Sequence, residues 1–494
     1  MGTAMNLHPP QIPPRRLWEA VRLKDEYSAR RTLTRGQAAW AVMLLLTIVL
    51  AVALRPLESA RALIGIVTLL YVSSLAFRLI TFARGLADPD VIAVSDEAAR
   101  SYPPDQLPVY SVLVPAYEEP EVIGQLVASI RALEYPRDRL DVKLLLEEDD
   151  DETILAAAAA SRDDSHVEIV LVPRGEPRTK PRACNYGLHL ARGEFVTIYD
   201  AEDRPEPLQL RRAVKALREL PRTVACLQAK LVYYNPNQNM ITRWFSAEYA
   251  MWFSQLLPGL VRQNVPLPLG GTSNHFRRDV LHRIGAWDPW NVTEDADLGV
   301  RLHRSGYRTA VLESTTLEEA NSDFINWVRQ RSRWYKGYMQ TWLVHMRHPI
   351  RLWRELGPAG FFGFQLFVGG TPLLALLNPV FWIFTVVWFA GRPDFMLSLF
   401  QGWIYYVGVL SLVFGNFLYI YASMISARRF GSPALVFAAM LSPIYWAMMS
   451  VAAIKASVQL LHAPSFWEKT VHGLDVAHRP PEPASGAAAE PQGA

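Results

Sequence analysis

The sequence predicts an integral membrane protein in which a mostly parallel α/β domain lies between membrane-spanning helices. Two observations indicate this fold class. Long, nearly uncharged apolar runs gather near both ends of the 494-residue chain, whereas residues 85–350 have the composition of an ordinary water-soluble domain. Within that central part, short apolar segments alternate with segments of helical pattern, which is typical of a parallel sheet with helices on both faces.

Composition sets further limits. The chain is 50% hydrophobic, 11% aromatic and 20% charged, carries a net charge of +3, and is long enough for two or three domains. We expect no nucleic-acid partner. Its only two cysteines, Cys184 and Cys226, lie in the central part, so the sequence offers neither a disulfide framework nor a structural zinc site.

The first predicted element is a transmembrane hairpin over residues 38–84. The run AAWAVMLLLTIVLAVAL has no charge and is about long enough to span a bilayer. The run 62–80 carries only Arg78, whose long side chain can reach the membrane surface. A signal peptide or a buried core helix is the alternative, but the first run begins too deep in the chain for a signal peptide. The basic segment 1–37 predicts a cytoplasmic N-terminus.

Residues 85–345 form the predicted central domain. The segments YSVLVPAY, VKLLLEED, HVEIVLVP and EFVTIYDA are expected to be buried strands, with EVIGQLVASIRAL and ETILAAAAASR as helices between them. In a parallel sheet of this kind, ligands bind at the carboxyl ends of the strands. The side chains that follow the strands are therefore the first candidates for a functional site.

Residues 346–462 are predicted to hold an interfacial helix and further transmembrane helices. The stretch through HPIRLWREL is amphipathic, and apolar runs follow at 361–390, 397–425 and 434–461. Three single spans would put the tail outside the cell, whereas a last run that is a re-entrant pair or lies in the membrane interface would keep the tail inside, and the sequence leaves both arrangements open. The tail, 463–494, is expected to be partly disordered.

Acidic side chains follow the first two strands. VLVPAYEEP leaves Tyr117 and Glu118 at a strand tip, and LLLEEDDDET places a run of acids after the next strand. A carboxylate there is suited to accept hydrogen bonds from a nucleobase or a ribose. A capped strand end and a solvated turn are the alternatives.

A third group of residues combines opposite charges. Lys180 and Arg182 in TKPRACNYGL are suited to a diphosphate, and Asp200, Glu202 and Asp203 in TIYDAEDRPEP offer the hard oxygen ligands that Mg²⁺ or Mn²⁺ prefers. A nucleotide diphosphate can share such an ion with the carboxylates. The alternative is a solvated acidic loop.

A fourth group lies further along the chain, in NVTEDADLG and FINWVRQRSRWYKGYMQTW. In the second segment a helix places Gln330, Arg333 and Trp334 on one face. An aromatic platform beside planar and charged donors has the elements of a sugar and phosphate site. A helix in the membrane interface is the alternative.

Taken in order, these motifs resemble those of the processive family 2 glycosyltransferases. An acidic pair after the second strand, Asp-x-Glu-Asp, Thr-Glu-Asp and Gln-x-x-Arg-Trp follow one another over roughly residues 105–345. The family includes cellulose, hyaluronan and chitin synthases, and the bacterial exopolysaccharide synthases are the most similar members, through LLLEEDDDET, DAEDRPEP, GGTSNHFR and FWEKTVHG. The resemblance implies a GT-A-type domain inserted between transmembrane helices, and Mg²⁺ or Mn²⁺ as cofactor.

The resemblance also implies residue roles. Asp295 corresponds to the general base that deprotonates the acceptor, and Trp334 to the ring beneath the acceptor sugar. Glu147 and Glu148 replace an Asp-Asp pair that holds the uridine, which is a departure from the family pattern. The implied sets are Asp295, Glu294, Gln330, Arg333 and Trp334 for catalysis, Ala116, Tyr117, Glu118, Glu147, Glu148, Lys180, Asp200 and Arg333 for the UDP-sugar, and Asp200, Glu202 and Asp203 for the metal ion.

The predicted function is membrane-bound, inverting polymerisation of sugar from a UDP-sugar, with UDP-glucose the expected donor, into a β-linked exopolysaccharide that leaves through the membrane helices. The expected partners are the UDP-sugar, the growing polysaccharide and the lipid bilayer, and export subunits are a possible further partner. The expected location is a bacterial inner membrane, with the catalytic domain in the cytoplasm. The alternatives are transfer of one sugar to a lipid-linked acceptor, and a multi-pass transporter or sensor with a nucleotide-binding domain.

Overall fold

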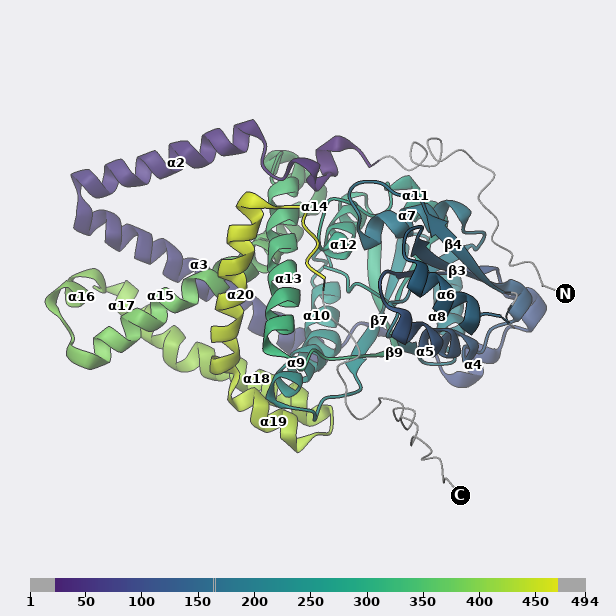
Figure 1. The fold of residues 1–494 in the computed structure, drawn as a ribbon. Coiled ribbons are helices and arrows are strands. Elements are labelled where there is room, and N and C mark those ends of the chain that lie inside the picture. The colour runs from purple at the N-terminus through teal and green to yellow at the C-terminus, as the bar shows by residue number, and fades with distance from the viewer. Residues whose placement is uncertain (1–22, 163, 165, 470–494) are drawn as a thin grey trace, which may run out of the picture.

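The computed structural model describes residues 23–162, 164 and 166–469. Figure 1 shows an α/β domain and a group of long helices that extends away from it. Most of the arginine-rich start and the part of the predicted disordered tail from residue 470 onward lie outside the described residues.

Within the described residues, nine strands form one sheet in the order β1-β9-β7-β8-β5-β2-β3-β4, with β6 paired to β9. The four predicted strands are confirmed as β2, β3, β4 and β5, which lie side by side in parallel. Strand β8 is antiparallel to both of its neighbours. The bounds are β1 Val91–Ile92, β2 Tyr110–Ala116, β3 Leu140–Glu147, β4 Val167–Val172, β5 Phe195–Ile198, β6 Arg204–Pro205, β7 Val224–Tyr233, β8 Asn274–Arg277 and β9 Arg308–Glu318.

Helices cover both faces of this sheet, as the sequence predicts. Alternate residues of a strand point to opposite faces, so Val112 and Leu144 pack with one helical layer while Leu113 and Leu145 pack with the other. The first layer contains α4 Asp96–Arg100, α5 Pro120–Arg131, α6 Asp151–Ala160 and α8 Gln209–Glu219. The second contains α7 Lys180–Leu190, α11 Arg278–Arg283 and α12 Glu294–Arg304.

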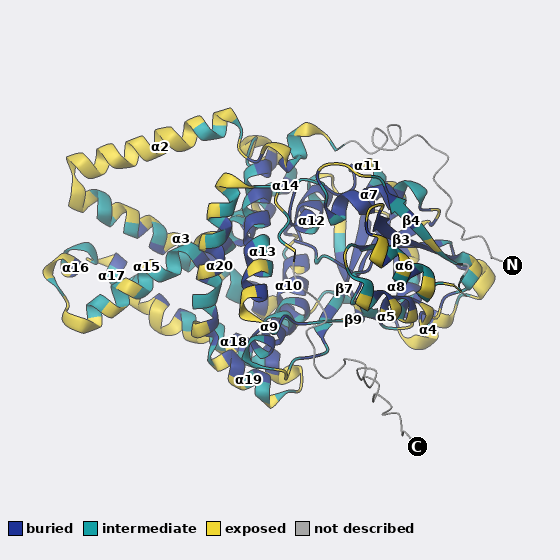
Figure 2. Cartoon of the chain, viewed as in Figure 1, coloured by how far each residue is buried: buried dark blue, intermediate teal, exposed yellow. Residues whose placement is uncertain are grey.

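Long apolar helices leave the α/β domain on one side (Figure 1). Within the described part of the chain, five helical segments are long and apolar enough to cross a membrane: Ala29–Leu54, Pro56–Ala87, Pro349–Gly391, Trp403–Arg429 and Ser442–His462. Figure 2 shows α2 exposed along almost its whole length, as expected of a helix that faces lipid. The Arg78 side chain, which is long enough to reach the membrane surface, contacts α15 (Gly370–Gly391) in this structure, where its Nη2 donates to Thr371 Oγ1 at 2.6 Å.

The helices of this part and those that join it to the sheet have the following bounds: α2 Arg35–Leu54, α3 Pro56–Ala87, α9 Met240–Met251, α10 Leu257–Arg262, α13 Phe324–His345, α14 Pro349–Phe364, α15 Gly370–Gly391, α16 Asp394–Leu399, α17 Trp403–Leu410, α18 Asn416–Arg429, α19 Pro433–Met440 and α20 Ser442–His462.

The last apolar helix, α20, packs along α13 (Figure 1). After its C-terminal end, the carbonyl oxygen of Phe466 accepts a hydrogen bond from Lys336 Nζ at 2.7 Å, and Lys469 Nζ donates to the carbonyl oxygen of Tyr117 at 2.9 Å. Residues 463–469 are therefore held against the α/β domain. Of the two arrangements that the sequence leaves open, this geometry agrees with a last apolar run that does not carry the tail across the membrane.

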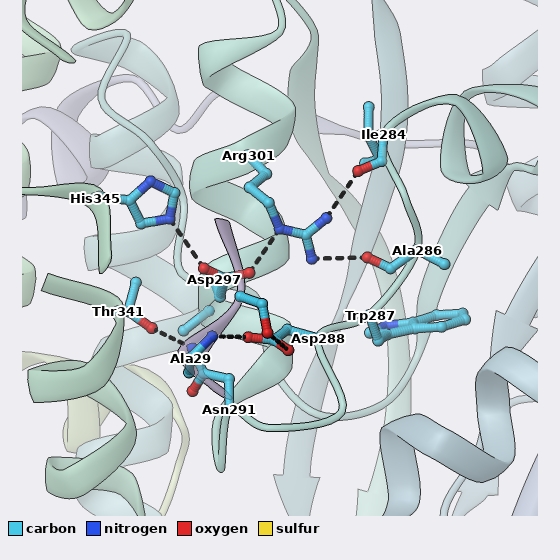
Figure 3. Close-up of polar contacts among 12 residues, drawn as sticks. Ala29, Ile284, Ala286, Trp287, Asp288, Asn291, Asp297, Arg301, Thr341 and His345 are labelled. Atoms are coloured by element: carbon cyan, nitrogen blue, oxygen red, sulfur yellow. Dashed lines mark hydrogen bonds and ion pairs between the residues drawn. The ribbon is translucent and has the colours of Figure 1, made fainter. Parts of the chain in front are cut away.

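A buried polar network anchors the first turns of α12 (Figure 3). Asp297 Oδ2 accepts a hydrogen bond from Arg301 Nε at 2.6 Å, and Asp297 Oδ1 lies 2.9 Å from His345 Nε2. Asp288 accepts the backbone N–H of Ala29, just before α2, at 2.5 Å. The side chains of Asp297 and Arg301 are 0% and 3% exposed, so this ion pair is shielded from water.

Replacing Asp297 by asparagine is expected to destabilise the protein by about 3–5 kcal/mol, because the guanidinium of Arg301 would stay buried without its counter-charge. The measurement is the free energy of unfolding of the detergent-purified protein. The matched control is Glu58→Gln, which breaks the exposed Arg55–Glu58 pair and is expected to cost about 1 kcal/mol or less. Equal losses in the two variants would contradict the prediction.

Candidate active site

The carboxyl ends of the parallel strands open into a large cavity of about 670 Å³. Its walls come from the ends of β2 and β3, the loop after β5, the start of α12 and one face of α13, and it continues between α3, α15 and α18. Most of the site residues predicted from the sequence meet there: Ala116, Tyr117, Glu147, Lys180, Asp200, Glu202, Glu294, Asp295, Gln330, Arg333 and Trp334.

The ends of β2 and β3 form one wall of this cavity. Glu147, the last residue of β3, is buried, and Arg182 Nη1 lies 3.4 Å from both of its carboxylate oxygens. Burial raises the pKa of Glu147, and the two arginines Arg182 and Arg178 oppose that rise. Arg178, which was not among the predicted residues, donates to Tyr117 Oη at 2.9 Å and lies over that ring. A ring, a carboxylate and a guanidinium together suit a nucleobase and its ribose.

Two predicted donor residues are absent from this wall. Glu148 lies beyond the end of β3, is exposed, and accepts the backbone N–H of Arg174 at 3.0 Å. Glu118 is exposed as well, and its carboxylate pairs with Lys469 at 3.0 Å. The structure therefore separates Glu118 and Glu148 from the other predicted donor residues, because their side chains turn outward from the strand ends.

The loop after β5 presents Asp200 and Glu202 to the cavity. Lys180, at the start of α7, forms an ion pair with Asp200, which raises the pKa of Lys180 although burial acts to lower it. Asp203 is turned the other way and is buried, and its Oδ2 accepts the backbone N–H of Asp200 at 2.7 Å and the hydroxyl of Thr272. Burial raises the pKa of Asp203, and the neighbouring acids add to the effect. Asp203 therefore shapes the loop, which separates it from the other two predicted metal ligands.

A divalent ion fits this loop if a ligand supplies part of its coordination shell. Within the part of the chain that the structure describes, no three acidic, histidine or cysteine side chains converge to hold an ion. Asp200 and Glu202 remain as two carboxylates on the cavity wall. One or two carboxylates completed by substrate phosphates is the usual way in which proteins hold Mg²⁺.

Glu294 and Asp295 begin α12 and line the same cavity. Burial, with the charge of Asp295 beside it, raises the pKa of Glu294 to about 8. Burial also raises the pKa of Asp295, to about 6, and the backbone N–H of Ala296, which donates to Asp295 Oδ1 at 2.8 Å, limits the rise. Near neutral pH Glu294 therefore keeps a proton while Asp295 is ionised, which is an arrangement suited to acid–base chemistry.

The predicted helix that carries Gln330, Arg333 and Trp334 is confirmed as part of α13, and all three side chains line the cavity. Its close approach to α12 depends on Gly337, since a Cβ at that position would lie 2.1 Å from Thr293 Oγ1. The acid pair and the aromatic ring therefore share one cavity because α13 packs directly on the residue before α12.

Residues 463–469, here called the C-terminal strap, complete the cavity wall. Trp467 and Lys469 line the cavity. Arg333 Nη1 donates to the carbonyl oxygen of Glu468 at 3.2 Å, and its guanidinium lies 4.7 Å from the centre of the Trp467 ring. Because Lys469 also reaches the end of β2, the strap joins α13 to the sheet. Trp467 and Lys469 were not among the predicted site residues, although the motif FWEKTVHG contains both.

Comparison with known proteins shows what the central part of the chain is similar to. Residues 104–337 match the model of Glycosyltransferase like family 2. Relatives include a probable glycosyltransferase YdaM of Bacillus subtilis (27% identical over 254 residues, 51% of this chain and 60% of the relative) and a beta-monoglucosyldiacylglycerol synthase of Synechocystis sp. (28% over 245 residues, 49% and 50%). A third is a probable glucomannan 4-beta-mannosyltransferase 1 of Arabidopsis thaliana (28% over 249 residues, 47% and 43%). The chain spans about half the length of the curated relatives it matches.

A solved structure shows the same architecture. The mannosyltransferase PcManGT from Pyrobaculum calidifontis, in complex with GDP-Man and Mn²⁺, has a TM-score of 0.51 and 20% identity over 82% of this chain and 99% of that chain. The predicted fold class is confirmed: a GT-A-like α/β domain flanked by apolar helices. The predicted enzyme class, a glycosyltransferase, is confirmed as well, and these matches give no support to a transporter or sensor.

Proposed function

Since residues 104–337 match the model of Glycosyltransferase like family 2, we propose that this chain transfers sugar from a UDP-sugar, UDP-glucose in the first instance, to the end of a growing β-linked exopolysaccharide. One observation carries the proposal. A single continuous cavity is lined by a wall suited to a nucleotide, by an acid pair with separated pKa values and by an aromatic ring, and it runs on between apolar helices.

On the donor side, Tyr117, Arg178 and Glu147 form the wall that would hold the uridine. Lys180 and Arg333 supply positive charge for the diphosphate. Asp200 and Glu202 would hold Mg²⁺ or Mn²⁺, which when bound supplies further positive charge to the departing diphosphate.

On the acceptor side, Asp295 takes the proton of the acceptor hydroxyl while that oxygen bonds to the anomeric carbon of the donor. The bond from this carbon to the diphosphate breaks at the same time, and Lys180 and Arg333 stabilise the charge that develops there. Attack from the face opposite the diphosphate inverts the configuration, which yields a β-linkage from an α-linked donor. Trp334 offers the apolar face of its ring to the acceptor sugar.

The membrane part of the cavity supports repeated extension. Its lining includes Tyr71 on α3, Asn378 on α15 and Asn416 on α18, and Tyr71 Oη donates to Asn416 Oδ1 at 2.6 Å. Polar groups inside apolar helices are costly unless they face a cavity or one another, and hydroxyl and amide groups suit a saccharide chain. We therefore propose that the product leaves along this path from a cytoplasmic catalytic domain in a bacterial inner membrane, where export subunits can receive it.

The rate of transfer is expected to rise with pH through about 6 and then to level off. Asp295 acts only as a carboxylate, and burial raises its pKa to about 6, so kcat/KM is expected to fall about tenfold for each pH unit below that value. The measurement is the pH profile of kcat/KM, with the binding of UDP followed at each pH to separate catalysis from donor affinity. A flat profile between pH 5 and 7 would exclude Asp295 as the base.

The test of the proposed function is a panel of UDP-sugars, with GDP-mannose added, incubated with the purified chain in lipid nanodiscs and Mg²⁺ or Mn²⁺. Release of UDP together with a long β-linked product is the expected result. No nucleotide release from any donor would overturn the proposal. A product longer by one sugar, carried on a lipid, would favour the second candidate function, single transfer to a lipid acceptor, which is motivated by the 28% identity to a glucosyldiacylglycerol synthase.

A further inference from the structure

Beside the ring of Trp334, in the wall of the same cavity, lies an ion pair between a buried guanidinium, Arg331, and a partly exposed carboxylate, Glu248, which the mechanism above does not use. Arg331 on α13 donates to both carboxylate oxygens of Glu248 on α9, at 2.9 and 2.5 Å. Tyr445 on α20 completes the cluster: its hydroxyl accepts from Arg331 Nη2 at 2.9 Å and donates to Glu248 Oε2 at 2.8 Å. Three helices that are far apart in the sequence therefore meet at these three side chains.

The cluster contacts the indole ring of Trp334 directly. The guanidinium of Arg331 lies 4.5 Å from the centre of the Trp334 ring, within the range of a cation–π interaction. Tyr249 stacks on the same indole at 6.3 Å with an interplanar angle of 23°, and Phe245 lies 5.7 Å away. Trp334 is half-buried and lines the cavity. Its indole is thus supported by charged and aromatic groups while part of it stays available to a ligand.

A contribution to the free energy of folding does not explain why Arg331 and Glu248, rather than apolar residues, occupy these positions. The Arg331 side chain is buried and that of Glu248 is only partly exposed. The cost of removing these charges from water therefore offsets much of their attraction, and apolar residues of similar volume often serve as well. What an ion pair with bidentate hydrogen bonds adds is a defined geometry. Here that geometry fixes α9 and α20 relative to the one turn of α13 that carries Trp334.

We propose that Glu248, Arg331 and Tyr445 are positioning residues that hold the indole of Trp334 as a rigid platform and thereby set the affinity of the enzyme for its saccharide acceptor. The inference rests on the proposed function, because it takes Trp334 as the ring beneath the acceptor sugar. It assigns to α20 a role beyond lining the cavity, since Tyr445 ties that helix to the platform.

The test uses the full chain and a soluble β-linked oligosaccharide as acceptor. Tyr445→Phe removes one hydroxyl and keeps the ring, so the ring contacts with Trp244 and Trp327 are retained. The KM for the acceptor is expected to rise about 3- to 10-fold, the size of one or two lost hydrogen bonds, whereas the KM for the UDP-sugar stays within about twofold. Tyr406→Phe, at a tyrosine that is 73% exposed on α17, is the matched control and is expected to change neither constant.

Measuring Tyr445→Phe in a second protein, one that already carries Trp334→Phe, distinguishes a role in positioning the indole from a general contribution to stability. If Tyr445 acts through the indole, Tyr445→Phe is expected to lose most of its effect on the acceptor KM in a Trp334→Phe protein, since the two changes then share one interaction. An equal rise in both backgrounds, or no rise in the wild-type background, would overturn the inference while leaving the proposed function intact. Absence of any transfer by the wild-type protein would instead overturn the proposed function.

Discussion

Asp295→Asn is expected to lower the turnover of sugar transfer by about 10²- to 10⁴-fold, the usual contribution of a positioned general base. Asparagine keeps the shape of the side chain and its hydrogen bond from the backbone N–H of Ala296, but it cannot accept the proton of the acceptor hydroxyl. The affinity for UDP is expected to stay within about threefold. Turnover is measured as UDP release with saturating donor and acceptor, and affinity by titration of UDP.

The neighbouring Glu294 provides the sharpest comparison for this prediction. Burial and the charge of Asp295 hold the pKa of Glu294 at about 8, so it is protonated where the enzyme is expected to work and is a poor candidate for the base. Glu294→Gln should therefore lose much less activity than Asp295→Asn. Asp138→Asn, at a side chain that is 80% exposed, is expected to behave as wild type. The reverse order of the two losses would assign the base to Glu294.

The parts of the fold that were predictable follow from local patterns. Four short apolar runs were predictable as strands because each is bounded by turn residues and the first three are each followed by a segment of helical period. In the structure they lie side by side in parallel. The spacing of Gln330, Arg333 and Trp334 gave the correct helix face for the same reason. The arrangement of α20 was not predictable, because its length and apolar composition also suit a membrane span. Contacts formed after its end, by Phe466 and Lys469, agree with the arrangement in which the tail does not cross the membrane.

The site residues that sequence reasoning misplaced depend on single-residue geometry. Glu147 is the last residue of β3 and lines the cavity, whereas Glu148 lies one position beyond the strand and is exposed to solvent. A run of consecutive acids does not indicate at which residue the strand ends. Asp203 was grouped with Asp200 and Glu202 by spacing alone, but a turn that returns its carboxylate to the backbone N–H of Asp200 removes it from the cavity. Arg178 contacts Tyr117 only because of the tertiary fold, and no local sequence pattern predicts that contact.

Removal of divalent metal by EDTA is expected to abolish sugar transfer, and binding of Mn²⁺ is expected to tighten at least about tenfold when UDP is present. Two carboxylates face the cavity, and Lys180 is already paired with one of them, Asp200. An ion bound there without phosphate oxygens would be incompletely coordinated and would compete with that lysine. By linkage, UDP must strengthen Mn²⁺ binding by the same factor as Mn²⁺ strengthens UDP binding. Both factors are measurable by calorimetry.

Variants within the loop after β5 then decide which acids hold the ion. Asp200→Asn is expected to remove the UDP-dependent gain in Mn²⁺ affinity, whereas Asp203→Asn should leave that gain in place and lower the thermal stability, because the Asp203 carboxylate binds the loop rather than the cavity. Glu206→Gln, which changes an acid just after β6 that is paired with Arg212, is the matched control. Loss of the gain in Asp203→Asn alone would restore Asp203 as a ligand and require the loop to rearrange when the ion binds. Unchanged activity in EDTA would leave Lys180 and Arg333 as the cations at the diphosphate, and the acidic loop would then serve to position Lys180.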